Sequence, residues 1–209
     1  EYYIAYHGIG QLDEDAGFYN IMIDWTKIDE ECNFNAPSRI SDLSLTADAT
    51  GELSATIDFT APSSTYKGGT LNEITGIDIS RDGELVKSFE NVAPGTPLSF
   101  TDSGLEEGMR SYTVAARNSY GRSVETTDSV YVGHDTPEKV TGIKATDEGD
   151  EILLTWDAVA TGANEGYVNA GEVSYVVTDP DGFILAEGVK DTEWRETVEP
   201  EGKMVTHIY

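Results

Sequence analysis

The three histidines are the side chains best suited to metal binding or acid–base chemistry, and their spacing disfavours both. His7, His134 and His207 lie roughly 130 and 70 residues apart, in different parts of the chain. No His-Glu-x-x-His motif and no pair at helical i,i+4 spacing occurs, although zinc sites commonly use such spacings. We therefore interpret each histidine as an ordinary, partly exposed imidazole.

Carboxylates are plentiful, but they are not arranged as catalytic pairs. Glu30/Glu31 and Glu106/Glu107 are sequence neighbours in expected turns, whereas a glycosidase pair must face one bond across a cleft. Two acidic loops, Asp13–Asp15 and Asp147–Glu151, offer the hard oxygen ligands that Ca²⁺ prefers. Neither loop has the spacing of an EF-hand, so we assign no metal site.

Nucleophile and cofactor motifs are also absent from the sequence. It contains no Gly-x-Ser-x-Gly elbow, no phosphate-binding P-loop and no Gly-x-Gly-x-x-Gly before a helix. Cys32 is the only cysteine, which excludes an intramolecular disulfide and a cysteine-rich zinc site. We predict that the chain is not an enzyme, has no catalytic residues and uses no cofactor.

The charge balance restricts the partners. Thirteen Lys and Arg face 39 Asp and Glu, a net charge of -26, and no segment is basic. Nucleic acids and anionic membrane surfaces would be repelled, because binding to them depends mainly on Lys and Arg. There is also no apolar run of about 18 residues, so we predict no membrane-spanning segment. We interpret the acidity as a source of solubility and mutual repulsion outside a cell.

The elements that carry these residues are expected to be strands throughout. A length of 209 residues indicates about two modules. Apolar residues alternate at period two, as at Tyr112, Val114 and Ala116, and turn formers such as Arg81-Asp82-Gly83 interrupt the runs about every ten residues. Helical periodicity is absent. This pattern predicts an antiparallel sandwich.

An internal repeat with a period near 100 residues indicates tandem copies of one fold. Its joints fall at Asn35-Ala36-Pro37 and at Gly133-His134-Asp135-Thr136-Pro137, with each proline expected where a first strand begins at a sheet edge. Such a period suits consecutive sandwiches better than a solenoid. The repeated landmarks are Pro37–Leu43 and Pro137–Ile143, Ile57–Phe59 and Leu154–Trp156, and Arg81–Leu85 and Pro180–Ile184.

At these landmarks the chain resembles the fibronectin type III family, in two consecutive copies. The resemblance rests on the opening prolines, on the second-strand run that ends at Phe59 or Trp156, and on the late strand Tyr112–Asn118 that leads to Gly121. It implies that Phe59 and Trp156 fill the space between two sheets. We expect Asn118 and Gly121 to shape the last hairpin, because both residue types tolerate positive φ.

Two departures from the family pattern affect the interpretation. The corner tyrosine of the family would fall nearer Arg110 than Tyr112, so we do not assign that corner. The second copy reaches Tyr209 inside what should be its sixth strand. An exposed sheet edge promotes association. We therefore expect either residues beyond Tyr209 or another chain to complete this copy.

The first 35 residues resemble the end of a different module. Tyr2–His7 and Phe18–Trp25 are expected to be consecutive strands, similar to the closing hairpin of a jelly-roll domain of the cleaved-adhesin or choice-of-anchor type. That family often has two acids in the last strand, but here Trp25 follows Asp24, so calcium ligation is not assigned. The aromatic residues Tyr2, Tyr6 and Trp25 suit sugar stacking, but packing in the jelly-roll core or between domains is the favoured interpretation.

The fold class is therefore all-β, with tandem immunoglobulin-like (fibronectin type III) β-sandwiches. We expect a truncated jelly-roll hairpin over 1–35, a first sandwich over 36–135 and an incomplete second sandwich over 136–209. Because the chain begins at Glu1 inside a strand-like run, we expect it to be cut from a longer protein, with its export signal upstream. The absence of disulfides favours a bacterial source, and the expected location is secreted or at the cell surface.

Three functions fit this organisation. The first is a non-catalytic spacer and interaction module of a multidomain bacterial surface protein. The second is a carbohydrate-binding or adhesive module, and the third is the accessory region of a secreted peptidase or glycosidase. The expected partner is a protein or polysaccharide at the cell surface, and the sequence identifies no binding residues.

Overall fold

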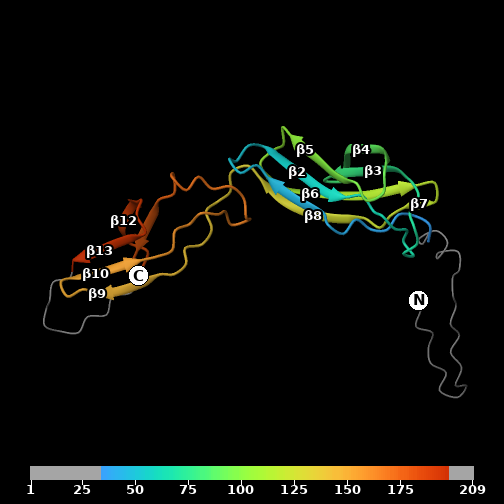
Figure 1. Cartoon of the computed structure of the whole chain (residues 1–209). Helices are drawn as coiled ribbons and strands as arrows, with labels where there is room; N and C mark the ends of the chain where they lie inside the picture. Colours follow the sequence, from blue (N-terminus) through green and yellow to red (C-terminus); the bar gives the residue numbers. More distant parts are fainter. Residues whose placement is uncertain (1–33, 198–209) are drawn as a thin grey trace, which may run out of the picture.

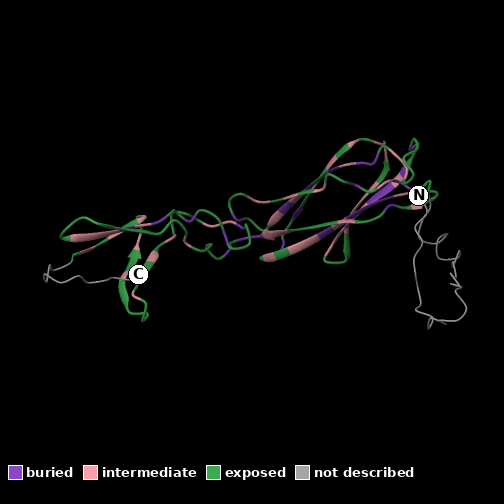
Figure 2. Ribbon diagram, turned by 90° about the horizontal axis from the view of Figure 1, so that it is seen from below, coloured by how far each residue is buried: buried purple, intermediate pink, exposed green. Residues whose placement is uncertain are grey.

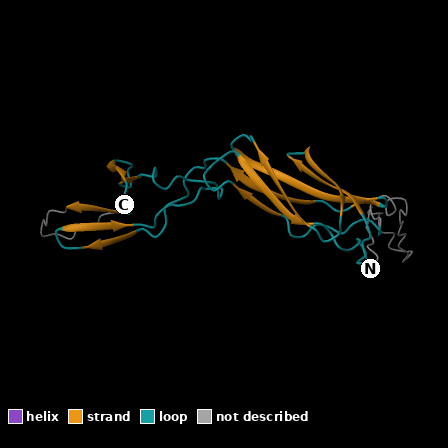
Figure 3. Ribbon diagram, turned by 45° about the horizontal axis from the view of Figure 1, so that its top comes forward, coloured by secondary structure: helices purple, strands orange, loops and turns teal. Residues whose placement is uncertain are grey.

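A computed structural model describes residues 34–197, and every regular element in that range is a β-strand. Figure 3 shows these strands joined only by loops and turns. The predictions for the jelly-roll hairpin, Asp24 and Cys32, and for the sixth strand of the second copy, fall outside the described residues. The strands are β1 Ser44–Ala47, β2 Ser54–Thr60, β3 Ile74–Arg81, β4 Glu84–Val92, β5 Pro97–Ser103, β6 Gly108–Asn118, β7 Gly121–Arg122, β8 Thr126–Val132, β9 Lys144–Asp147, β10 Glu151–Thr155, β11 Tyr175–Thr178, β12 Ile184–Val189 and β13 Glu193–Thr197.

The first unit is a sandwich of two antiparallel sheets. One sheet has the order β1-β2-β5, and the other has the order β4-β3-β6-β7, with β8 also paired to β6 (Figure 1). Alternate side chains of β2, β3 and β6 point between the sheets, because successive residues of a strand face opposite sides. Figure 2 shows many of the buried positions of the chain in this unit. Its buried core consists of Ile40, Ala55, Ile57, Phe59, Ala61, Leu71, Ile74, Ile77, Ile79, Leu105, Tyr112, Val114, Ala116 and Val132.

The expected alternation is confirmed in the core strands. Tyr112, Val114 and Ala116 are fully buried on β6, and Phe59 is buried on β2. Leu53, which continues the β2 alternation in the sequence, lies before the strand and remains exposed. Burying a large apolar side chain contributes about 1.5–3 kcal/mol, so these strands supply most of the driving force for folding of this unit.

A polar cluster connects the two sheets inside the first unit. Asp102 on β5 accepts a hydrogen bond from the hydroxyl of Tyr112 on β6, at 3.1 Å, and pairs with Arg81 on β3, at 2.5 Å. The tyrosine ring is fully buried, and the carboxylate is nearly so. Burial, together with the charge of Asp102, raises the pKa of Tyr112 to about 12. The buried carboxylate is thus satisfied by one partner from each of two strands in the opposite sheet.

Lys87 covers an open side of the same sandwich. It lies on β4, whose other edge is unpaired among the described strands, and β5 ends its own sheet in the same way. The Lys87 ammonium is 5.1 Å from the ring centre of Phe89 and 6.0 Å from that of Phe100. A lysine held between two edge strands opposes addition of a further strand at this side.

The turns form at the positions that the sequence predicts, but one of them is stabilised by a different contact than expected. Asp82 and Gly83 both have positive φ in the β3–β4 hairpin, which confirms that turn. Gly121 also has positive φ, but Asn118 does not. The Asn118 side chain instead accepts hydrogen bonds from the backbone N–H groups of Tyr120 and Gly121. Asn118 therefore shapes the hairpin as expected, but the expected reason was wrong, because its amide oxygen and not a positive φ provides the turn geometry.

The opening prolines do not start the first strands, contrary to expectation. Pro37 and Pro137 form isolated bridges to Thr65 and Gly162, ahead of β1 and β9. Each proline therefore belongs to the entry of its unit. The hydrogen bonds of each bridge are made by the residues on either side of the proline, so the missing N–H donor is tolerated.

The second unit, over residues 137–197, has fewer paired strands. One sheet has the order β9-β10-β13, and β11 pairs with β12. Leu154, Trp156 and Val177 form its small buried core, which confirms the core position expected for Trp156. Among the described residues β11 has a hydrogen-bonded neighbour on one side only.

We expect Tyr112→Phe to lower the unfolding free energy of the first unit by about 1–3 kcal/mol, because Asp102 loses a buried donor. The wild type should also lose stability as pH rises from about 10 toward about 12, since the folded state retains a phenolic proton that the unfolded chain releases. Urea titrations followed by the NMR signals of β3 and β6 measure both effects. Tyr120→Phe, at an exposed turn, is the matched control. An unchanged midpoint for Tyr112→Phe would contradict the role given to this cluster.

Candidate functional site

The side chains considered above for metal binding or catalysis, where they lie within residues 34–197, make local structural contacts. His134 lies at the junction of the two units, and His7 and His207 fall outside the described residues. Glu106 pairs with Arg110, and Glu107 accepts a hydrogen bond from the backbone N–H of His134. The two glutamates therefore belong to the loop architecture of the first unit.

The acidic loop Asp147–Glu151 has local partners. Asp147 accepts a hydrogen bond from the backbone N–H of Gly149, and Glu148 and Glu151 both pair with Arg195 on β13. Within residues 34–197 no three His, Cys, Asp or Glu side chains gather in an arrangement that could hold a metal ion. The loop Asp13–Asp15 is outside this range.

The most elaborate polar arrangement lies at the joint, which we define as residues 133–137 with the turn 162–167. The Asp135 carboxylate accepts hydrogen bonds from the backbone N–H of Asn164 at 2.6 Å, from the Asn164 side-chain amide at 3.0 Å and from the backbone N–H of Gly166 at 3.2 Å. It also accepts one from the N–H of Thr136 at 2.7 Å. The segment that leaves the first unit is thereby bound to a turn of the second.

Burial and hydrogen bonding act in opposite directions on Asp135. Its side chain is 9% exposed, and burial alone raises the pKa of a carboxyl group. The hydrogen bonds from Asn164, Gly166 and Thr136 outweigh that effect and lower the pKa of Asp135 below its ordinary value. The Asp135 carboxylate is therefore ionised at neutral pH, and N–H groups of the protein donate hydrogen bonds to it.

Close packing accompanies these hydrogen bonds. A Cβ atom on Gly166 would lie 2.5 Å from Cδ1 of Tyr131 and 2.7 Å from Cβ of Asp135, so a side chain at this position would force the turn away from the linker. Gly51 has φ of +82°, and a Cβ there would lie 2.5 Å from Cδ1 of Tyr167. A turn of the first unit thus contacts an aromatic ring of the second.

Tyr167 is the aromatic centre of the joint. Its ring meets that of His134 edge to face, with the centroids 5.2 Å apart and the planes at 79°. The backbone N–H of Asp135 donates to the carbonyl oxygen of Tyr167 at 2.8 Å. Backbone, ring and carboxylate contacts therefore act on the same few residues of the linker.

A second aromatic pair lies where the described chain enters the first unit. Phe34 and Tyr66 are about half exposed, with ring centroids 6.5 Å apart, and the Lys67 ammonium lies 5.2 Å from the Phe34 centroid. We call Phe34 and Tyr66 the entry pair. In the ribbon this entrance is at the opposite end of the first unit from the joint (Figure 1).

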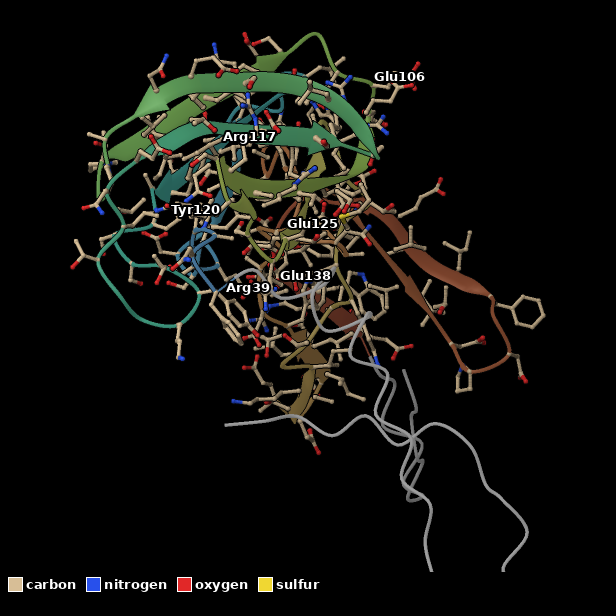
Figure 4. The ribbon with its side chains drawn as sticks, turned by 90° about the vertical axis from the view of Figure 1, so that its right-hand side faces the viewer. Arg39, Glu106, Arg117, Tyr120, Glu125 and Glu138 are labelled. Atoms are coloured by element: carbon tan, nitrogen blue, oxygen red, sulfur yellow. The ribbon has the colours of Figure 1, made fainter. Side chains whose placement is uncertain are left out.

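The outer face of the larger sheet carries an ion-pair network. Arg117 on β6, labelled in Figure 4, lies 3.4 Å from Asp78 on β3 and 2.5 Å from Glu90 on β4. One guanidinium bridges both acids across three strands, and the three side chains together keep one net negative charge. Ion pairs therefore connect the strands on this face of the sheet.

The sequence delimited the joint but did not identify Asp135 as its key residue. The signal was the combination of an aspartate before Pro137 with glycines at positions 162 and 166, about 30 residues later in the same copy of the repeat. The carboxylate needs backbone donors that approach it closely, and glycines permit that approach. Only the folded turn brings these residues together.

Comparisons with known proteins found similar chains among solved structures only. No family model and no curated protein matches the chain. Among solved structures, the chicken CNTN1 FN1–FN3 domains are similar at 15% identity and a TM-score of 0.33, covering 77% of this chain and 57% of that one. The central fibronectin-III array of RIM-binding protein is similar at 18% identity and a TM-score of 0.38, covering 79% and 54%. This chain spans little more than half the length of either.

The strand order and register define the fold class as all-β, with tandem immunoglobulin-like sandwiches of the fibronectin type III kind. No helix in residues 34–197 is long and apolar enough to cross a membrane.

We expect Asp135→Ala to loosen the joint while leaving both units folded, because the donors on Asn164 and Gly166 lose their shared acceptor. Measured ¹⁵N relaxation should then give the two units more independent rotational correlation times than in the wild type. Asp128→Ala is the control, since Asp128 is exposed and its carboxylate bonds only the adjacent backbone N–H of Ser129. Identical relaxation in Asp135→Ala and the wild type would show that the carboxylate does not couple the units.

Proposed function

We propose that this chain is a non-catalytic spacer and interaction module of an extracellular multidomain protein from the surface or secretions of a bacterium. In this proposal residues 1–35 end a preceding jelly-roll domain, 36–135 form one sandwich and 136–209 belong to the next. The observation that carries the proposal is the joint, where the buried Asp135 carboxylate binds the linker to a turn of the second unit.

A spacer must hold the domains on its two sides at a defined distance. A flexible linker cannot do so, because its end-to-end separation fluctuates. The joint opposes such fluctuation in three ways. Asp135 fixes the linker backbone, Tyr167 packs on His134, and Gly51 allows a turn of the first unit to touch the same ring. Rotation of one unit against the other would break contacts of all three kinds.

The charge and the sheet edges support the same role. A net charge of -26 makes neighbouring copies repel each other, so the modules stay separate in solution. Lys87 protects one open side of the first sandwich from strand addition. These features favour an extended module that does not aggregate with itself.

A narrow distance distribution between the two units is the expected outcome for a spacer. Spin labels would be placed at Glu84→Cys on the first unit and Phe183→Cys on the second, both exposed, in a Cys32→Ser background. Double electron–electron resonance should give one narrow distance peak, and Asp135→Ala should broaden it. A broad distribution without Asp135→Ala would reject the spacer role.

A carbohydrate-binding or adhesive role is the second candidate, and the entry pair favours it. Two exposed rings 6.5 Å apart present apolar faces on which a sugar could stack.

We expect an adhesive module to show saturable binding on a glycan array, with and without Ca²⁺, that Phe34→Ala and Tyr66→Ala each reduce about tenfold or more. Tyr120→Ala is the matched control, because Tyr120 is an exposed aromatic residue outside the entry pair. Binding that none of these substitutions changes would exclude the entry pair as the sugar site. Silence across the array would leave the spacer role alone.

A further inference from the structure

The hairpin of β11 and β12 in the second unit exposes four large apolar side chains. Phe183 is 70% exposed, Ile184 is 60%, Val176 is 57% and Leu185 is 39%. Three of these residues lie on the paired strands, and Phe183 is the last residue before β12. We call these four residues the hairpin patch.

The strand pairing explains why the patch faces outward. Val177 packs on the core of the second unit, so its neighbours on β11, Val176 and Thr178, face the opposite side. Ile184 is paired with Thr178 and therefore shares that outer face. A register shift between Val177 and Thr178 leaves Leu185 as the extra residue of a β-bulge on β12. Such a bulge re-aims side chains at the edge of a sheet.

The first unit contains the same hairpin and provides an internal comparison. Its strands β3 and β4 also shift register at one point, and the pair beyond the shift joins Ser80 to Leu85. Ser80 and Leu85 therefore correspond to Thr178 and Ile184. Leu85 is 64% exposed, close to the value for Ile184. An exposed aliphatic residue thus lies at the same place in both copies of the fold.

The surroundings of this aliphatic residue differ between the two copies. Counted from the corresponding pairs, Val176 takes the place of Asp78, which is an acid of the ion-pair network on the first unit. Phe183 takes the place of Glu84, directly before the aliphatic residue. The second unit therefore has an apolar surface where the first unit has two acids.

The rim of the hairpin patch is negatively charged. Residues 175–189 contain no Lys, Arg or His, and their three acids are Asp179, Asp181 and Glu187. The Asp179 carboxylate accepts hydrogen bonds from two backbone N–H groups of its own turn, both at 2.9 Å. Asp181 and Glu187 are exposed. Lys190 follows directly, but its ammonium donates to the backbone carbonyl oxygens of residues 171–173.

The negative rim decides which class of partner fits the patch. A membrane would have to accept Asp181, in the turn before Phe183, and burial of an ionised carboxylate is costly. A second copy of this chain would bring like charges together, since each copy has a net charge of -26. A cationic amphipathic helix fits better, because its apolar face covers an apolar surface while its lysines or arginines pair with the acids.

We propose that the hairpin patch binds a cationic amphipathic segment of a partner protein. Phe183 and Ile184 are the apolar anchors, and Asp181 and Glu187 face the lysines or arginines of the segment. This inference names a partner class for the interaction role proposed above and rests on that role. It does not involve the joint, so its failure would leave the distance measurement that tests the spacer unaffected.

The test is an NMR titration of the full chain with a short helical peptide built only of leucine and lysine. Binding should be saturable and should shift the amide signals of β11 and β12. Ile184→Ser should weaken binding about tenfold or more, because it removes an apolar anchor. Leu85→Ser is the matched control, since it makes the same change at the corresponding exposed position and should leave the affinity unchanged. A peptide with glutamate in place of every lysine should not bind.

Several results would overturn the proposal. Equal effects of Ile184→Ser and Leu85→Ser, or unshifted β11 and β12 amides, would show that the patch does not hold the peptide. Equal binding of the glutamate peptide would show that the rim does not select cations. Binding to phosphatidylcholine vesicles that Ile184→Ser abolishes, without binding of the lysine peptide, would identify a lipid surface as the occupant. A dimer in light scattering that Ile184→Ser dissociates would identify a second copy.

Discussion

The need to bury one face of every strand between two sheets governs both units. Strands alternate their side chains, so an apolar face gains free energy only if a second sheet covers it. In the first unit β6 and β8 complete this cover, and residues such as Ile57, Ile77 and Val114 are wholly withdrawn from water. In the described part of the second unit the cover stops at β11, and the interior around Trp156 stays open to one side.

Polar side chains that are buried in these interiors need hydrogen-bond or ion-pair partners, because an unpaired buried charge raises the free energy of the folded state. Asp102 is accommodated by Arg81 and Tyr112, and Asp135 by the donors of Asn164, Gly166 and Thr136. The two carboxylates do different work. Asp102 holds two sheets together within one unit, whereas Asp135 holds two units together. The indole N–H of Trp156, which has no acceptor among the described residues, is an exception to this rule, and Trp156 lines the open side of the second unit.

The cations and the excess carboxylates of the chain have different roles. The few cations of the chain are used locally, as with Arg117 between Asp78 and Glu90, Lys87 between two phenylalanines and Arg195 between Glu148 and Glu151. The excess of carboxylates is left to face solvent, where it keeps copies apart.

The sequence by itself determined the strand class, the repeat and the buried face of the run Tyr112, Val114 and Ala116, because alternation and turn chemistry are local properties of the chain. The core roles of Phe59 and Trp156 followed from the resemblance to the fibronectin type III family. The sequence did not determine that Pro37 and Pro137 precede the first strands, or that Asn118 acts through its side chain, because both depend on which backbone groups find partners. Tertiary structure alone decided the cluster of Arg81, Asp102 and Tyr112 and the binding of Asp135 to the turn 162–167. Those contacts join residues that are distant in sequence, and only the packed sheets and the folded turn bring their charges and donors within bonding distance.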